Sequence, residues 1–206
     1  MYIPSQYKNE DLAEVKDFIS SNSFAILINE LQGKPWATHT PLELDKDDQG
    51  NDILIGHIAR ANPQWKAFET KPEVLCVFNG PHTYVSSSWY KEEEVPTWNY
   101  IAVHIYGTLS IMSESEVLSW LHGLVAHYEK EEKTPVSLKD MSPATLKQVR
   151  GVVGFRIKIN EIQAAYKLSQ GREEDHARII HELHHKKDAG SLQVSHIMKK
   201  RGTKDS

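Results

Sequence analysis

The stretch Phe24–Leu44, FAILINELQGKPWATHTPLEL, predicts a β-hairpin from which the remaining architecture can be worked out. Phe24–Ile28 is a short apolar run with the length of a buried strand, and Pro35–Leu44 is a second strand candidate. Between them, Gln32–Lys34 contains glycine and has the composition of a tight turn. We therefore expect antiparallel strands rather than strands joined by crossover helices.

Further strand candidates follow along the chain, and each is apolar or alternates between apolar and polar residues. They are Ile53–His57, Val74–Phe78, Asn99–Met112 and Gly151–Ile162. A break is expected at Gly80-Pro81, because both residues interrupt regular structure. Many short strands without regular alternation of strand and helix favour an antiparallel barrel over a Rossmann fold.

Helices are predicted between and around these strands. Leu12, Val15 and Phe18 recur at helical spacing within Asn9–Asn22, and Ser113-Glu-Ser-Glu116 is a capping box that opens a helix to about Tyr128. Further helix signals are the cap at Asn62, the start at Ser142-Pro143 and the segment Arg172–Lys187. The helices therefore decorate the predicted barrel.

The composition is that of a globular protein, because 39% of the 206 residues are hydrophobic and 25% are charged. No apolar run approaches the roughly 18 residues of a membrane span, and the first residues lack the pattern of a secretory signal. The single cysteine, Cys76, lies in an apolar strand and is expected to be buried. These features predict a cytoplasmic protein that does not insert into membranes.

The charge is unevenly distributed along the chain, whose net charge is −4. Residues 186–206 hold six lysine or arginine residues against two aspartates, so the preceding body is acidic and would repel DNA. We expect one domain over 1–187, with a helical insertion at about 113–150. A flexible basic tail is expected over 188–206, and any contact with DNA would use this tail.

His181-Glu-Leu-His-His185 matches the H-E-x-x-H pattern of zinc proteases, in which two histidines one helical turn apart bind the metal. A catalytic zinc site also needs a third ligand and a walled cavity, and His196 is the single histidine that follows. With 11 histidines in the chain, we interpret the match as a coincidence and predict no metal cofactor.

Three segments concentrate polar and aromatic residues in a way that a plain core would not: 38–42, 56–65 and 86–100. A helix that starts at Asn62 would offer free N–H groups to an anion, and Arg60 would complete a phosphate cradle. Aromatic side chains could wall a flat ligand; they are Trp65, Trp89, Trp98 and Tyr100. Helix capping and core packing explain the same residues equally well.

Seven motifs between residue 1 and about residue 185 resemble those of a known family in the same order. They are MYIP (1–4), GKPxATHxPL (33–42), GHIAxANPQW (56–65), GPHxYVSxSWY (80–90), VPTWNY (95–100), VHxYG (103–107) and IQAAYKLSQ (162–170). The sequence resembles the PaiB family, bacterial proteins described as FMN-binding negative transcriptional regulators or as protease-synthase and sporulation regulators.

The resemblance implies a mainly β fold with peripheral helices, the FMN-binding split barrel that pyridoxamine phosphate oxidases share. This fold has six antiparallel strands in Greek-key order. It also implies a homodimer with FMN sites at the subunit interface. By fold analogy, the resemblance also implies the cofactor-binding residues. His39 and Thr40 would line the isoalloxazine edge, and the phosphate and ribityl chain would be held by His57, Ala59, Arg60, Asn62 and Gln64. The site would be closed by Ser87, Ser88, Trp89 and Trp98, and the residues after the last strand that face the flavin would be Lys167, Ser169 and Gln170.

One departure from related folds concerns the phosphate, which is often held by a cluster of arginine and lysine. Here the corresponding stretch offers Arg60, Asn62, Gln64 and Lys66, which is a milder cradle. Weak or partial flavin occupancy is consistent with this set.

The resemblance favours an FMN-binding negative transcriptional regulator, although the sequence contains no helix-turn-helix. The alternative is a flavin-dependent oxidoreductase that uses FMN with a nicotinamide or small-molecule substrate, and a flavin carrier without turnover is a third reading. No acid–base pair identifies a catalytic residue. His39, Tyr90, Lys167 and Gln170 are the candidate substrate contacts in the oxidoreductase.

Overall fold

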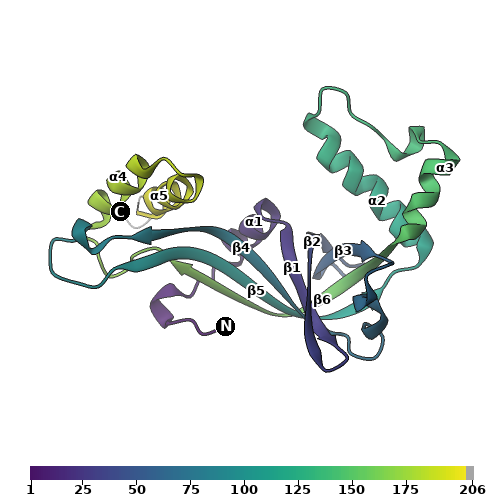
Figure 1. The fold of residues 1–206 in the computed structure, drawn as a ribbon, viewed down its shortest axis with the longest axis horizontal. Helices are drawn as coiled ribbons and strands as arrows, with labels where there is room; N and C mark the ends of the chain where they lie inside the picture. Colours follow the sequence, from purple (N-terminus) through teal and green to yellow (C-terminus); the bar gives the residue numbers. More distant parts are fainter. Residues whose placement is uncertain (203–206) are drawn as a thin grey trace. The chain divides into compact units, whose positions relative to one another are not determined.

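The computed structural model describes residues 1–202, and residues 203–206 lie outside the described part (Figure 1). Six strands pair in the order β1-β2-β3-β6-β5-β4 and close into a barrel. Their bounds are β1 Phe24–Leu31, β2 Lys34–Lys46, β3 Asp52–Ala59, β4 Glu73–Val85, β5 Thr97–Ile111 and β6 Val152–Lys167. The predicted six-stranded antiparallel barrel with peripheral helices is confirmed.

The predicted helices occur in the expected order, and one further α-helix, α5, was not predicted. The α-helices are α1 Leu12–Ser21, α2 Glu114–Tyr128, α3 Pro143–Leu146, α4 His176–Lys186 and α5 Ala189–Gly202. The 3-10 helices used below are η2 Pro63–Ala67, η3 Ser87–Trp89 and η6 Lys147–Gly151. Local chemistry explains the starts: Asp11 caps α1 through two backbone N–H groups, and Ser113 and Glu116 form the capping box of α2. No helix of the described residues is long and apolar enough to span a membrane.

The contacts within the chain divide it into two compact units. The first consists of Met1–Asn22, Phe78–His104 and Ile162–Ser206, and the second of Ser23–Val77 and Ile105–Glu161. The predicted single domain over 1–187 with an insertion at 113–150 therefore stays a prediction, and each unit is described by itself below.

The second unit contains the β1–β2 hairpin. Gln32 and Gly33 both have positive φ, as a two-residue hairpin turn requires. Alternate residues of β1 point inward, so Leu27 is buried together with Leu54 and Phe155. A second apolar cluster forms where α2 meets β3, with the buried residues Ile53, Ile55, Met112 and Val117.

In the first unit, α5 is a packed helix. Val194 and Met198 are buried, and the Asn99 amide lies 3.6 Å from the Met198 sulfur. At Gly190 a Cβ atom would lie 2.6 Å from the His82 carbonyl oxygen, so only glycine allows this close approach to β4. Figure 1 shows α4 and α5 (yellow) side by side.

The predicted flexible tail over 188–206 is therefore wrong for residues 189–202. Asp188 precedes this helix and accepts from the Ser191 backbone N–H, and residues 203–206 lie outside the described residues. Half of the α5 positions are polar and hide its short buried stripe, so its composition resembles that of a solvated tail.

Three element boundaries also differ from expectation. The break predicted at Gly80-Pro81 does not occur, and β4 continues through both residues. The φ angle of proline is compatible with an extended backbone, so Pro81 removes only one backbone N–H donor from the strand. Gly80 lies against the Phe18 ring. The last strand continues five residues beyond Ile162, so Lys167 ends β6 rather than following it. The predicted helix at Arg172 starts at His176, because Arg172 is held by Glu94 and Asp175.

Candidate functional site

The predicted site residues fall into two sets, one in each unit, and the second unit holds those between His39 and Gln64. His39 is exposed on β2 and stacks on Phe24 with ring centroids 6.2 Å apart. Thr40 is buried, and its hydroxyl donates to the His57 carbonyl oxygen at 2.6 Å. This bond ties β2 to the end of β3, where the chain leaves the sheet.

His57 has a nitrogen that no protein atom satisfies. Its Nδ1 atom is buried and has no hydrogen-bond partner among the described residues. The ring packs edge-on against Trp120 of α2, with centroids 5.5 Å apart. Burial holds the pKa of His57 below its ordinary value, so the imidazole is neutral at pH 7. A buried nitrogen without a partner costs roughly 1–3 kcal/mol, which a ligand could recover.

Arg60 follows β3, with Ala59 as the last strand residue. Its Nε donates to the Arg150 carbonyl oxygen at 2.9 Å and one Nη donates to that of Val152 at 3.2 Å. The guanidinium also lies over the Trp65 ring, 5.9 Å from its centroid. Two of the five N–H donors thus hold the group in place, and the exposed side chain retains donors for an anion.

Asn62 and Gln64 serve the protein itself. Asn62 donates to the Thr38 hydroxyl at 2.8 Å and accepts from the Gln64 backbone N–H at 3.1 Å. The Gln64 side chain is fully buried; its amide donates to Asn29 at 3.0 Å and to the Leu27 carbonyl at 3.2 Å, and its oxygen accepts from Thr38. These two residues position the loop that carries Arg60.

The helix start at Asn62 is a weaker anion site than the sequence suggests. It opens a five-residue 3-10 helix, η2, rather than a longer α-helix. A helix this short aligns few peptide dipoles. The cap itself uses the Gln64 N–H, so the anion-binding chemistry of this segment rests mainly on Arg60.

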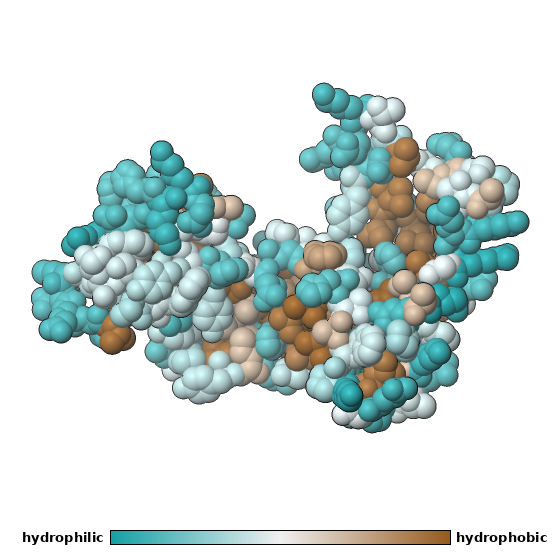
Figure 2. All heavy atoms as spheres, viewed as in Figure 1, coloured by the Kyte–Doolittle hydropathy of each residue, from teal (hydrophilic) through white to brown (hydrophobic). Residues whose placement is uncertain are grey.

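An apolar cavity of about 750 Å³ adjoins Arg60 and Trp65 within the second unit. Its lining comes from α2, α3, η6 and β6 and includes Met112, Val117 and Val149. Figure 2 shows hydrophobic residues (brown) gathered over α2 and α3. The cavity is large enough for an organic ligand.

The first unit holds the other predicted residues. Ser87, Ser88 and Trp89 form η3, and Ser88 is exposed with its carbonyl oxygen 3.2 Å from Arg178. Trp98 is 54% exposed on β5, beside His82 and Tyr84 with centroids 6.1 and 6.0 Å away. A large exposed aromatic ring supplies a surface for a flat ligand.

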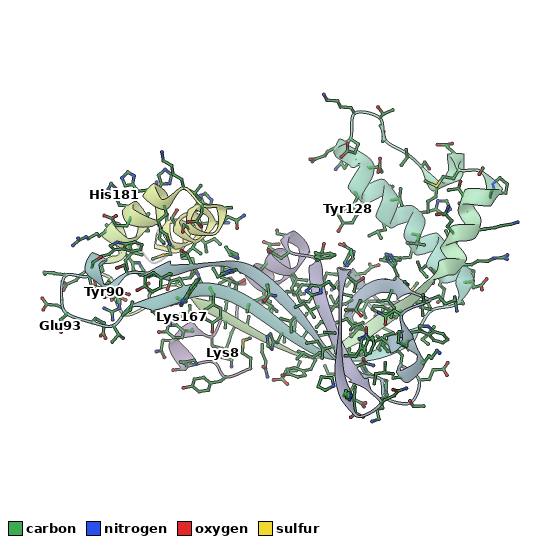
Figure 3. All side chains as sticks on the ribbon, viewed as in Figure 1. Lys8, Tyr90, Glu93, Tyr128, Lys167 and His181 are labelled. Carbon is green, nitrogen blue, oxygen red and sulfur yellow. The ribbon has the colours of Figure 1, made fainter. Side chains whose placement is uncertain are left out.

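The residues near the end of β6 divide by role. Lys167 donates to the Thr97 hydroxyl and lies over the Tyr7 ring at 5.6 Å, and it is labelled in Figure 3. Ser169 is buried, with its hydroxyl paired to the Asn99 amide at 2.9 Å. Gln170 bonds backbone groups at both ends of its amide. Ser169 and Gln170 therefore stabilise the turn, and Lys167 is the residue with a partly exposed cation.

Sequence reasoning missed Trp120 as a neighbour of His57, and it missed the burial of Tyr90. Tyr90 is buried with an unpartnered hydroxyl, and the Arg172 guanidinium covers its ring at 4.2 Å. Tyr90 was named only as a substrate contact, and its position between serines and a charged loop gave no sign of burial. Trp120 lies in a helix far along the sequence, and no spacing rule connects it to His57.

Comparison with known proteins places the chain in a family. The model of a family described as "Putative FMN-binding domain" matches residues 1–161. The "Protease synthase and sporulation protein PAI 2" of Bacillus subtilis (strain 168) is 44% identical over 200 residues, which cover 96% of each chain. The predicted resemblance is confirmed.

Solved structures show the same fold. The flavocytochrome Anf3 from Azotobacter vinelandii has a TM-score of 0.62 at 18% identity, over 83% of this chain and 75% of that one. The FAD and heme binding protein from Mycobacterium smegmatis has a TM-score of 0.60 at 13% identity, over 83% and 79%. At these identities the likeness concerns the fold alone.

Proposed function

Because the chain belongs to this family of FMN-binding domains, we propose that it is a cytoplasmic, homodimeric negative regulator of transcription that holds FMN beside the β3–η2 loop. The observation that supports the cofactor site is that the β3–η2 segment, within residues 1–161 matched by the family model, offers two groups to a ligand. They are the exposed guanidinium of Arg60, which is held in place, and the buried Nδ1 atom of His57, which has no hydrogen-bond partner among the described residues. The regulatory role is supported by the 44% identical relative, whose name refers to protease synthesis and sporulation.

The residues of the loop fit a phosphorylated flavin. A guanidinium already oriented by two carbonyl groups loses little entropy when it binds a phosphate. His57 offers a neutral buried nitrogen, and His39 with Phe24 offers an exposed aromatic surface. When bound, FMN supplies a ring system that accepts and donates electrons.

The residues of the first unit complete the proposal. Ser87, Ser88, Trp89, Trp98 and Lys167 are proposed to contribute to the flavin site across the subunit interface. Thr40, Ala59, Asn62, Gln64, Ser169 and Gln170 are proposed to position the strands and loops that carry it. Hydroxyls and an exposed indole suit the polar edge and flat face of a flavin.

The homodimer is supported by an apolar sheet face in the second unit. On the outward side of the β1–β2 hairpin, Phe24, Ile26 and Ile28 pair with Pro41, His39 and Ala37. Phe24 is 67% exposed in the single chain. Contiguous exposed apolar patches mark interaction surfaces, and a second copy of the chain is the proposed partner of this face. Sedimentation at micromolar concentration should give twice the mass of the chain.

The first prediction concerns FMN affinity. Arg60→Ala should weaken FMN binding by about 10–100-fold, because a hydrogen bond to a charged group contributes roughly 1.5–3 kcal/mol. Quenching of flavin fluorescence on titration measures the dissociation constant. Lys46→Ala is the matched control, because Lys46 is an exposed cation at the opposite ends of β2 and β3. Equal affinity of the Arg60 variant and the wild type would place the phosphate elsewhere.

The second prediction concerns DNA. Lys199 is an exposed cation on α5, whereas Arg201 is paired with Glu14 at 3.1 Å. If the regulator contacts promoter DNA through α5, Lys199→Glu should weaken the gel shift of its upstream promoter fragment several-fold and reduce the salt dependence of binding. Lys139→Glu, which reverses an exposed charge in the second unit, should leave the shift unchanged. An unchanged shift with Lys199→Glu would remove α5 from the DNA contact, and no shift with the wild type would mean that regulation is indirect.

A further inference from the structure

Two of the four histidines of helix α4, His181 and His185, lie one turn apart on its exposed side. The opposite side of the helix holds the buried residues Ile179 and Leu183. Figure 3 labels His181 on this helix. Because neither imidazole contributes to the buried side, both are available to solvent and to ligands.

The two imidazoles converge on one point. Their Nε2 atoms are 3.0 Å apart, and the rings are nearly perpendicular, with centroids 4.2 Å apart and an interplanar angle of 89°. Without a ligand, one Nε2–H donates to the lone pair of the other nitrogen. Such an exposed bond contributes little stability, so the fold does not require this arrangement.

The separation of the nitrogens matches chelation of a metal ion. Metal–nitrogen distances of about 2.0–2.1 Å across a 3.0 Å separation give a bite angle of about 94°. This angle is close to the right angle of square-planar or octahedral coordination and smaller than the tetrahedral angle that zinc prefers.

We propose that His181 and His185 form a bidentate site for a divalent transition ion with right-angled coordination, Cu²⁺ or Ni²⁺, whose remaining positions are filled by water. Both Nε2 lone pairs bind the metal, and the proton on one Nε2 moves through water to Nδ1 of the same ring. No electron is transferred. Among residues 1–202 no cluster of three or more His, Cys, Asp or Glu side chains could hold a metal, so the site lacks the third ligand of a zinc protease. The match of the motif to zinc proteases remains a coincidence.

Calorimetric titration of the full-length protein with NiCl₂ tests the site. We expect one ion per chain from this site, and each of His181→Ala and His185→Ala should weaken binding at least tenfold. Outer-shell changes alone cost roughly 10–100-fold, and removing a ligand should cost no less. Ni²⁺ should also raise the unfolding temperature of the wild type, because it binds the folded helix, and this rise should disappear in both variants.

His184→Ala is the matched control, because His184 is exposed on the same helix but lies about 100° around its axis from His185. It should bind Ni²⁺ like the wild type. All three substitutions are at exposed positions, so unfolding temperatures without metal should agree. Binding that survives His181→Ala and His185→Ala, equal loss with His184→Ala, or no binding at 100 µM NiCl₂ (about a hundredfold above a micromolar dissociation constant) would overturn the proposal.

Discussion

Gln64→Leu should destabilise the protein by about 3 kcal/mol or more. Leucine has nearly the same size as glutamine but no polar atoms, so the Leu27 carbonyl, the Asn29 side chain and the Thr38 hydroxyl each lose one hydrogen bond. The Thr38 hydroxyl keeps the bond that it accepts from Asn62. Gln64 is fully buried, and each buried polar group left unsatisfied costs roughly 1–3 kcal/mol. The effect should appear as a fall of about 6–12 °C in the unfolding temperature, at roughly 2–4 °C per kcal/mol for a chain of this size.

Gln148→Leu is the control for this substitution, because Gln148 is exposed on η6 in the same unit. It should change the unfolding free energy by no more than about 0.5 kcal/mol. Gln64→Leu should also weaken FMN binding, since the amide network positions the loop that carries Arg60. If the two leucine variants unfold alike, the network around Gln64 contributes nothing and the assigned positioning role is wrong.

The strands were predictable because their signals are local. Apolar runs and period-two alternation located all six, and the capping box at Ser113 located the start of α2 within one residue. Errors arose where tertiary contacts override local signals: Gly80-Pro81 stays in a strand because the Phe18 ring occupies the space a side chain would need. Likewise, the sequence predicts a tail in place of α5 because the buried stripe of this helix is short.

The candidate site was predictable only as a set of segments. The sequence identified the β3–η2 loop, but Gln64 and Asn62 have the same polar composition whether they bind a ligand or each other. Only their contacts show that they bond within the protein. His57 is the reverse case: it resembles any strand histidine in the sequence, and its unpartnered nitrogen is visible only when the neighbours from α2 are in place.

The last prediction tests whether α5 is part of the folded protein. Val194→Asp should destabilise the first unit by about 3 kcal/mol or more, because Val194 is fully buried and the substitution would move a carboxylate out of water into an apolar position. Separation of α5 from β4 would return the carboxylate to water and expose the segment before the helix. Proteolysis should therefore cleave after Lys186 or Lys187 faster than in the wild type.

Gln193→Asp introduces the same charge at the neighbouring, exposed position of the same helix and should leave stability and cleavage unchanged. Comparison of Val194→Asp with Gln193→Asp therefore separates the effect of burying a charge from the effect of adding one to the helix. A packed helix predicts a large difference between the two aspartate variants, whereas a solvated tail predicts none. The close contact of Gly190 with the His82 carbonyl supports the first outcome, since glycine at this position serves a docked helix and would be unnecessary in a free tail.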